Sequence, residues 1–309
     1  MNLISVNSLE IFKKNTYIPS DIGLVSDNAY LSVVATNNCN MNCPYCINSL
    51  TDRSLNLSVN KMSKNVKELL KHYDIKEAII LWWEPTLHPD IVNMIKALNG
   101  CWIKKVRLTT NGIALTDKLL IDMVNAWLYG INISYHNEDF ISKTRLSEIF
   151  SLCKKLKIKL RINTNIWKNN HDNIDDFIDF YNNHLKDNCN EVRVSNIILK
   201  DSFSVNEYNS FTAKQMILSD DEYNDFFTKL INSFDVTKID NPDTLGFVRY
   251  ILIPISTPII VNRNINSKVS EQVCENAISD ISKRKINTFK CLVSGNISLS
   301  WNEWNTFIR

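Results

Sequence analysis

Three cysteines lie on eight consecutive residues, at positions 39, 43 and 46, directly after an apolar run over residues 30–36. Thiolates at this spacing can bind three irons of a cubane iron–sulfur cluster and leave the fourth iron open for chemistry, whereas four thiolates make a closed electron carrier. A disulfide framework uses even numbers of cysteines at wider spacing. The alternative is zinc held by Cys39, Cys43, Cys46 and a fourth ligand such as His88, although zinc sites more often use paired C-x2-C knuckles.

The cysteine loop, with Tyr45 at its aromatic position, resembles the signature loop of the radical S-adenosylmethionine (radical SAM) superfamily. Three later segments resemble motifs of the same superfamily in the same order, and the resemblance covers about residues 29–200. The segments are Trp82-Trp83-Glu84-Pro85-Thr86-Leu87-His88-Pro89, where the superfamily reads G-G-E-P-x-L-H-P, then Thr109-Thr110-Asn111-Gly112, and finally Asn132-Ile133-Ser134.

This resemblance implies an enzyme in which Cys39, Cys43 and Cys46 hold a [4Fe-4S] cluster whose open iron binds the amino and carboxylate groups of SAM. One electron then breaks a C–S bond of SAM, giving methionine and a 5′-deoxyadenosyl radical that takes a hydrogen atom from the substrate. The substrate is unknown, a peptide or a cofactor precursor being examples, and the implied electron donor is a flavodoxin or a ferredoxin. No catalytic residue is assigned. The residues expected to bind SAM are Tyr45, Trp82, Trp83, Glu84, Asn111, Ser134, Asn163 and Ile197.

Several of these residues have structural alternatives. Glu84 accepts a hydrogen bond from the SAM ammonium, braces its loop, or is a solvated loop carboxylate. Asn111 has a second role open to it, because Asn-Gly forms tight turns unaided. Polar side chains on barrel strands are costly to bury unless they are satisfied. Four of them therefore favour a lumen filled by a ligand: Asn132, Ser134, Arg161 and Asn163.

The chain is poor in glycine and rich in tryptophan. Its 6 glycines are about 2% of 309 residues, where roughly 7% is usual, and it has 7 tryptophans. Trp82 and Trp83 occupy the two glycine positions of the G-G-E-P segment, and Trp127 ends a helical pattern. Glycine would let the backbone approach the SAM ammonium, which two indoles would crowd. Either the tryptophans are genuine, which favours a degenerate iron–sulfur protein that does not bind SAM, or they are glycines encoded by a reassigned UGA codon.

Composition limits the class of protein. Hydrophobic residues make up 44% and charged residues 22%, which is typical of a globular protein with one large α/β domain or slightly more. The net charge of +2 gives no electrostatic argument for a nucleic acid or an acidic membrane. The longest apolar run, residues 250–261, is too short to cross a bilayer and contains prolines. No secretory segment is visible, and a reducing cytoplasm suits thiols that must load a cluster.

Strand and helix patterns alternate along most of the chain. Six such units in a row predict parallel strands joined by right-handed crossovers, which a flat sheet and an open barrel both satisfy. The resemblance favours a partial (β/α)6 TIM-like barrel, with the motifs at the C-terminal ends of the strands. The predicted strands are 30–36, 77–81, 104–109, 130–135, 158–164 and 191–199. The helices between them are predicted over 59–73, 89–100, 116–127, 143–156 and 173–184.

We expect three parts in the chain: an N-terminal extension over 1–28, a radical SAM core over 29–205, and a smaller α+β region over 206–309. The last part resembles a degenerate SPASM/twitch-like extension. No second cluster is expected there, because Cys274 and Cys291 are widely spaced and Ser300 stands where a cysteine would. Relatives that make the molybdenum cofactor end in Gly-Arg-Arg, whereas this chain ends Phe307-Ile308-Arg309, so that activity is not expected.

Overall fold

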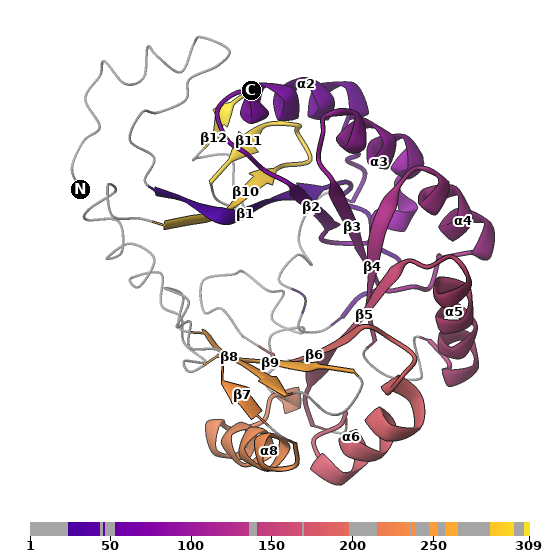
Figure 1. Ribbon diagram of the computed structural model, residues 1–309, viewed down its shortest axis with the longest axis vertical. Helices are drawn as coiled ribbons and strands as arrows, with labels where there is room; N and C mark the ends of the chain where they lie inside the picture. Colours follow the sequence, from indigo (N-terminus) through magenta and orange to yellow (C-terminus); the bar gives the residue numbers. More distant parts are fainter. Residues whose placement is uncertain are drawn as a thin grey trace.

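A single sheet of 12 strands runs through the part of the chain that the structure describes, with the strand order β12-β11-β10-β1-β2-β3-β4-β5-β6-β9-β8-β7. Figure 1 shows the sheet curling into an open barrel that does not close. The computed structural model describes residues 24–43, 46, 53–135, 141–168, 170–197, 215–234, 236–238, 247–252, 257–264, 285–299 and 306–309.

Six parallel strands form the middle of this sheet, and helices cover its convex face (Figure 1). The alternation predicted from the sequence is thereby confirmed. The strands are β1 (Leu24–Val34), β2 (Glu77–Leu81), β3 (Lys105–Thr110), β4 (Leu128–Ser134), β5 (Lys159–Ile166) and β6 (Glu191–Asn196). The helices are α2 (Val59–Leu70), the 3-10 turn η1 (Pro85–Leu87), α3 (Ile91–Gly100), α4 (Asp117–Asn125), α5 (Lys143–Lys155), α6 (Ile174–Phe180) and the π turn η2 (Tyr181–Leu185).

The strands that follow residue 206 extend this sheet at both of its edges. β10 pairs in parallel with β1 at one edge, and β9 pairs in parallel with β6 at the other. Their bounds, with those of the neighbouring elements, are α8 (Asp220–Asn232), β7 (Val236–Lys238), β8 (Phe247–Leu252), β9 (Ile259–Asn264), β10 (Lys285–Cys291), β11 (Ile297–Ser298) and β12 (Thr306–Ile308). The predicted division into three parts stays a prediction, and the first five residues of β1, 24–28, lie in the expected extension.

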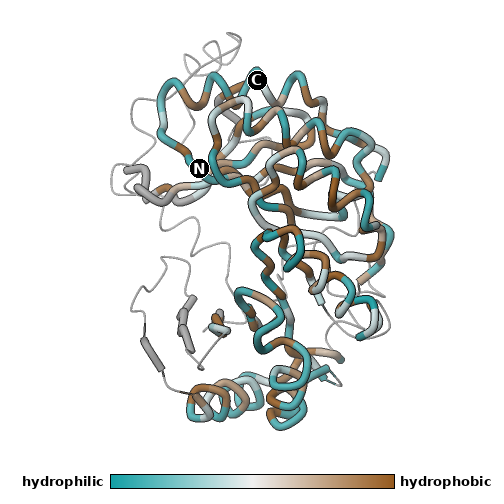
Figure 2. Tube along the Cα trace, turned by 45° about the vertical axis from the view of Figure 1, so that its right-hand side comes forward, coloured by the Kyte–Doolittle hydropathy of each residue, from teal (hydrophilic) through white to brown (hydrophobic). Residues whose placement is uncertain are grey.

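Side chains alternate between the two faces of each strand. On β5, Leu160, Ile162 and Ile166 are buried under the helices, whereas Arg161 and Asn163 are half-buried on the lumen face. Figure 2 shows the matching alternation of hydrophobic and hydrophilic residues along the helices and strands. A side-chain cap starts most helices, for example Ser142 on α5 and Ser219 in the capping box of α8. No helix among the described residues combines the length and the apolar character needed to cross a membrane.

An ion pair lies across the lumen face near the N-terminal ends of β2 and β3. Arg107 Nε donates to Glu77 Oε1 at 3.0 Å, and the guanidinium lies 4.9 Å from the ring centre of Tyr129. Gly130 faces this group from β4. A Cβ at Gly130 would lie 2.9 Å from Arg107 Nη1 and 3.1 Å from Lys159 O. The absence of a side chain at 130 therefore leaves room for the half-buried guanidinium.

We expect Gly130→Ala to lower the free energy of unfolding by about 1–3 kcal/mol, because the added methyl group must displace a packed arginine or a backbone carbonyl. Gly100→Ala is the matched control, since a Cβ there meets nothing within 4 Å. It should be neutral or stabilising by about 0.5–1 kcal/mol, because alanine suits a helix better than glycine. Urea unfolding of both variants measures the difference, and equal stability of the two would contradict this role of Gly130.

Candidate cofactor site

The cysteine loop leaves the C-terminal end of β1 and is held at its base by backbone hydrogen bonds. Asn37 N donates to Leu55 O at 2.9 Å, and Thr36 Oγ1 donates to the same carbonyl at 3.1 Å. Thr36 Oγ1 also accepts a hydrogen bond from Asn38 N at 3.0 Å, which turns the chain out of the strand. The loop therefore starts from a fixed point at the mouth of the barrel, where ligands of parallel α/β folds bind.

Cys39, Cys43 and Cys46 are half-buried thiols that are not joined in disulfides. Cys46 N donates to Cys43 O at 3.0 Å, so the C-x2-C part forms a tight turn. Burial raises the pKa of Cys39, and the nearby acidic groups of Glu84 and Cys46 act in the same direction. Within the described residues, no three His, Cys, Asp or Glu side chains are already gathered around one point for an ion. Three soft thiols without a fourth partner nevertheless suit a cubane cluster by their donor chemistry.

Glu84 is the most buried charged side chain at the site, with 0% exposure. Its carboxylate accepts hydrogen bonds from Thr110 Oγ1 at 2.5 Å, from Asn111 N at 2.7 Å, and from Thr86 Oγ1 and N at 2.5 and 3.1 Å. Its backbone N donates to Asn38 O at 3.0 Å. Burial raises the pKa of Glu84 despite these donors. Glu84 thus braces the loops after β1, β2 and β3, and the alternative of a solvated carboxylate is wrong.

Asn111 forms a second link to the cysteine loop. Its Nδ2 donates to Asn40 Oδ1 at 2.8 Å, while its Oδ1 accepts from Ile113 N at 3.0 Å. The turn role considered from the sequence is therefore present, together with a cross-loop contact that the sequence did not reveal. The expected contact of Asn111 with SAM stays a prediction.

His88 uses both ring nitrogens for structure. Nδ1 accepts from Asp90 N at 3.0 Å, which leaves Nε2 as the protonated nitrogen, and Nε2 lies 3.0 Å from Leu57 O. The ring is buried, and burial lowers its pKa. A zinc ion would need a lone pair that neither nitrogen can offer without breaking one of these bonds. His88 does not fit the fourth position of a zinc site.

The lumen face of β4 and β5 has acceptors without donors. Asn132 is 3% exposed and donates to Thr109 Oγ1 at 3.1 Å, but its Oδ1 has no protein partner. Asn163 Oδ1, opposite Ser134 in the register, is also buried and unpartnered. A buried acceptor without a donor costs free energy. The two amides therefore suit a ligand that brings hydrogen-bond donors into the lumen.

Ile197 and the two tryptophans after β2 complete the predicted set. Ile197 is buried at the end of β6, where its N donates to Tyr223 OH at 3.4 Å, and that hydroxyl donates to Ile166 O. Trp82 and Trp83 are half-buried in the loop before Glu84, with ring centres 6.1 Å apart. Tyr45 lies outside the described residues. Its contact with SAM stays a prediction, as do those of Trp82, Trp83, Glu84, Ser134, Asn163 and Ile197.

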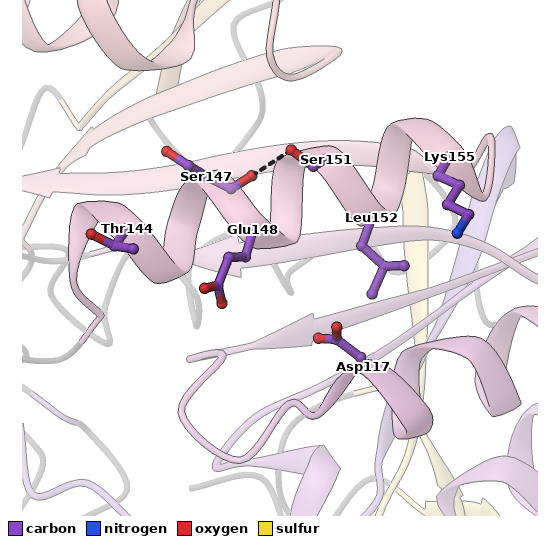
Figure 3. A pocket seen from close by; sticks show the side chains of 7 residues that line it. All are labelled: Asp117, Thr144, Ser147, Glu148, Ser151, Leu152 and Lys155. Atoms are coloured by element: carbon purple, nitrogen blue, oxygen red, sulfur yellow. Dashed lines mark hydrogen bonds between the residues drawn. The ribbon is translucent and has the colours of Figure 1, made fainter.

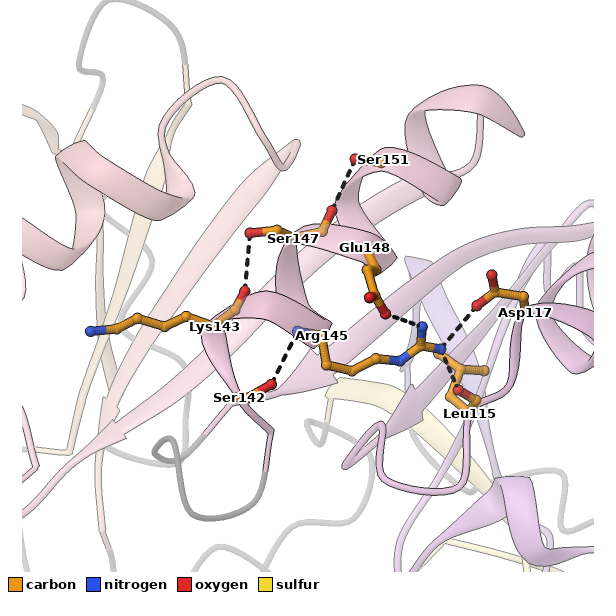
Figure 4. A network of polar contacts seen from close by, with 8 residues as sticks. All are labelled: Leu115, Asp117, Ser142, Lys143, Arg145, Ser147, Glu148 and Ser151. Carbon is orange, nitrogen blue, oxygen red and sulfur yellow. Dashed lines mark hydrogen bonds and ion pairs between the residues drawn. The ribbon is translucent and has the colours of Figure 1, made fainter.

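A surface groove of about 640 Å³ lies on the outer side of the barrel between α4 and α5 (Figure 3). Arg145 shapes its wall by bonding Asp117 at 3.0 Å, Glu148 at 2.8 Å and Leu115 O at 2.9 Å (Figure 4). Its lining lacks the cysteines and the buried acceptors of the lumen. We therefore place the cofactor site at the barrel mouth and not in this groove.

The family model named Radical SAM superfamily matches residues 33–183, which include the cysteine loop, Glu84, Asn111 and the unpartnered amides. The chain belongs to the radical SAM superfamily. Proteins of this superfamily bind a [4Fe-4S] cluster and SAM, so both expected cofactors and the expectation of an enzyme are confirmed at the level of the family.

Two curated relatives share part of this radical SAM chain. It is 31% identical over 170 residues to "GTP 3',8-cyclase" of Chlorobaculum tepidum, covering 50% of each chain. It is 29% identical over 231 residues to "Molybdenum cofactor biosynthesis protein moc-5" of Caenorhabditis elegans, covering 69% of this chain and 37% of the relative. The chain thus spans half or less of the length of these relatives.

A solved structure described as native anSMEcpe with bound AdoMet and a Cp18Cys peptide has a TM-score of 0.52 to this chain, with 15% sequence identity. The match covers 69% of this chain and 60% of the other. It supports the open α/β barrel and, at this identity, the fold alone.

Three parts of this radical SAM site were not found from the sequence. Asn37 Oδ1 is a third buried acceptor without a partner, two residues before Cys39. Asn40 and Thr86 supply the contacts that join the loops. Only Thr86 had a local signal, since Glu84 two residues earlier, followed by proline, is a helix-capping pattern.

We expect Glu84→Ala to lower the free energy of unfolding by roughly 3 kcal/mol, because Thr110 Oγ1 and Asn111 N lose their acceptor inside the protein. Glu84→Gln keeps one acceptor oxygen and should lose less. Glu68→Ala on the solvent side of α2 is the control and should change the stability little, because surface ion pairs contribute little. Urea unfolding measures all three, and a cost for Glu84→Ala as small as the control would contradict the bracing role.

The lowered pKa of His88 predicts that the stability of the fold depends on pH. Because burial lowers its pKa, the folded protein binds a proton there less tightly than the unfolded chain. Its contribution to stability is present above the unfolded pKa and is lost as pH falls through that value toward the folded pKa. Unfolding measured from about pH 8 to about pH 5 should show this loss, and His88→Asn should flatten it. His72→Asn, on an exposed helix end, is the control, and an unchanged profile in His88→Asn would refute the assignment.

Proposed function

We propose that this chain is a radical SAM enzyme in which Cys39, Cys43 and Cys46 are the ligands of the [4Fe-4S] cluster. Held by these residues, the cluster would supply the electron for reductive cleavage of SAM, the chemistry that yields methionine and a 5′-deoxyadenosyl radical able to take a hydrogen atom from the substrate. The observation that supports this most is the direct bonding of the cysteine loop to Glu84 and Asn111 at the mouth of an open barrel.

Other residues of the chain position the cysteine loop, bind the ligands and exclude water. Glu84 and Asn111 hold the cysteine loop against the ends of β2 and β3. The unpartnered oxygens of Asn132 and Asn163 accept from hydroxyl or amino groups of the ligands. Ile197 supplies an apolar surface that excludes water from the reacting groups. An external flavodoxin or ferredoxin provides the electron, in a cytoplasmic setting.

Two substrate classes have support from relatives. The curated relatives named GTP 3',8-cyclase favour a purine nucleoside triphosphate. The peptide in the anSMEcpe structure belongs to a protein that shares only the fold, so a peptide substrate has weaker support. Incubation of the loaded enzyme with SAM, reductant and GTP tests the first class, through consumption of GTP in step with formation of 5′-deoxyadenosine.

Replacement of any one of Cys39, Cys43 or Cys46 by alanine should abolish cluster loading. Anaerobic incubation of the parent chain with iron and sulfide should give about four irons per chain and a brown colour. Cys153→Ala is the matched control, because burial raises the pKa of this α5 thiol to about 12 and keeps it protonated. It should load iron as the parent does.

A parent chain that stays colourless, or a triple alanine variant that still loads iron, would end the proposal. Loaded protein that forms no 5′-deoxyadenosine with SAM and reductant would favour the degenerate iron–sulfur alternative, once the residues at 82 and 83 have been tested as described below.

A further inference from the structure

Four tryptophans share a backbone conformation that side chains rarely adopt. The angle φ is +74° at Trp82, +47° at Trp83, +70° at Trp102 and +65° at Trp127. In this left-handed region the Cβ atom approaches the following carbonyl oxygen, so glycine is the usual residue. Among the described residues, four of the seven non-glycine residues with positive φ are tryptophans, in a chain with 7 tryptophans among 309 residues.

Trp102 occupies the position after α3 where helices commonly end in glycine. Trp102 N donates to Asn99 O at 2.9 Å and Ile103 N donates to Leu98 O at 3.3 Å. This pair of bonds is a Schellman motif, whose left-handed residue is usually glycine. Ile103 and Leu98 are buried, as is common in this motif, whereas the indole of Trp102 is 88% exposed. The backbone is that of a glycine cap, and the side chain contributes little burial.

Trp127 has the first of these two bonds at the end of α4. Its N donates to Val124 O at 2.9 Å, and its side chain is 70% exposed. Lys157 after α5 shows that another residue type can also take this conformation, with φ of +55° and the same two bonds as at Trp102. What requires an explanation is that four of the seven non-glycine residues with positive φ are tryptophans.

Trp167 provides the contrast. Trp167 is 4% exposed, so its indole is packed in the protein interior as is usual for tryptophan. It is also absent from the residues with positive φ. The anomaly therefore affects particular positions and not tryptophan in general. A codon with two decodings accounts for this, because UGA read as glycine by the cell is written as tryptophan under another code, while UGG always encodes tryptophan.

We propose that residues 82, 83, 102 and 127 are glycines in the protein that the source cell makes, and that Trp167 is a genuine tryptophan. At 82 and 83 this inference deepens the proposed function, since two glycines free the backbone of the loop before Glu84 for close contact with the SAM ammonium. At 102 and 127 the inference is independent of any ligand, because both residues lie at outer helix ends.

Glycine and alanine variants test the inference without reference to SAM. The comparison of Trp102→Gly with Trp102→Ala isolates the Cβ atom, since both remove the indole. At 102 and 127 the glycine variant should have the higher urea midpoint, because the left-handed backbone penalises Cβ. At Trp167 the order should reverse, with Trp167→Gly below Trp167→Ala. The same order at all three positions would overturn the inference.

Binding of SAM tests the pair at 82 and 83. Iron-loaded protein with Trp82→Gly and Trp83→Gly together should bind SAM at least about tenfold more tightly than the iron-loaded parent chain, a difference of ~1.4 kcal/mol. Equal affinity with equal product formation would overturn the inference at these positions. If the helix-end variants behave as expected and the loaded double variant neither binds nor cleaves SAM, the proposed function fails while the glycine inference stands.

The codons of the gene and the peptide masses of the native protein identify these residues directly. The codons for 82, 83, 102 and 127 should be UGA and the codon for 167 UGG, and tryptic peptides from the source cell should have the mass of glycine at the four positions. A UGG codon, or a peptide with the mass of tryptophan, overturns the inference at that position.

Discussion

The buried carboxylate of Glu84 is the constraint on which the mouth of the barrel depends. A carboxylate with no solvent contact is costly unless donors surround it, and here the donors come from the ends of neighbouring strands. Thr110 and Asn111 belong to the end of β3, Thr86 to the turn after β2, and the Glu84 backbone binds Asn38 beyond β1. Satisfying one charge therefore fixes three loops relative to one another, including the loop that has the cysteines.

The lumen below this brace has polar side chains of two kinds. The charged ones are paired, Arg107 with Glu77 and Arg161 with Glu191, so their charges neutralise each other within the protein. The amides differ, because the oxygens of Asn132, which is the register partner of Arg161, and of Asn163 have no protein partner. The ion pairs therefore serve folding, whereas the amides have hydrogen-bonding capacity left for a ligand.

The strands and helices were predictable because their apolar periods and caps are local. Thr116, for example, caps α4, which lies within the helix predicted over 116–127. The partners of β9 and β10 were not predictable, because a strand pattern does not say which edge of a sheet it joins. The burial of Glu84 and the link from Asn111 to Asn40 were likewise hidden, since both depend on residues brought together from different loops. The split of the fifth helix into α6 and a π turn at Tyr181 left no local signal either.

The family match covers the strands that carry the cofactor site but not the strands that follow it. The family match ends at residue 183, before β6 begins at Glu191, so it contains the cysteine loop, Glu84 and both unpartnered amides. The wall formed by β6 and β9, and the edge formed by β10, lie beyond it. Residues that bind SAM need not change with the substrate, whereas the walls that face the substrate must. We therefore expect the chemistry to follow the superfamily and the specificity to reside in the strands after β5, beyond the end of the family match.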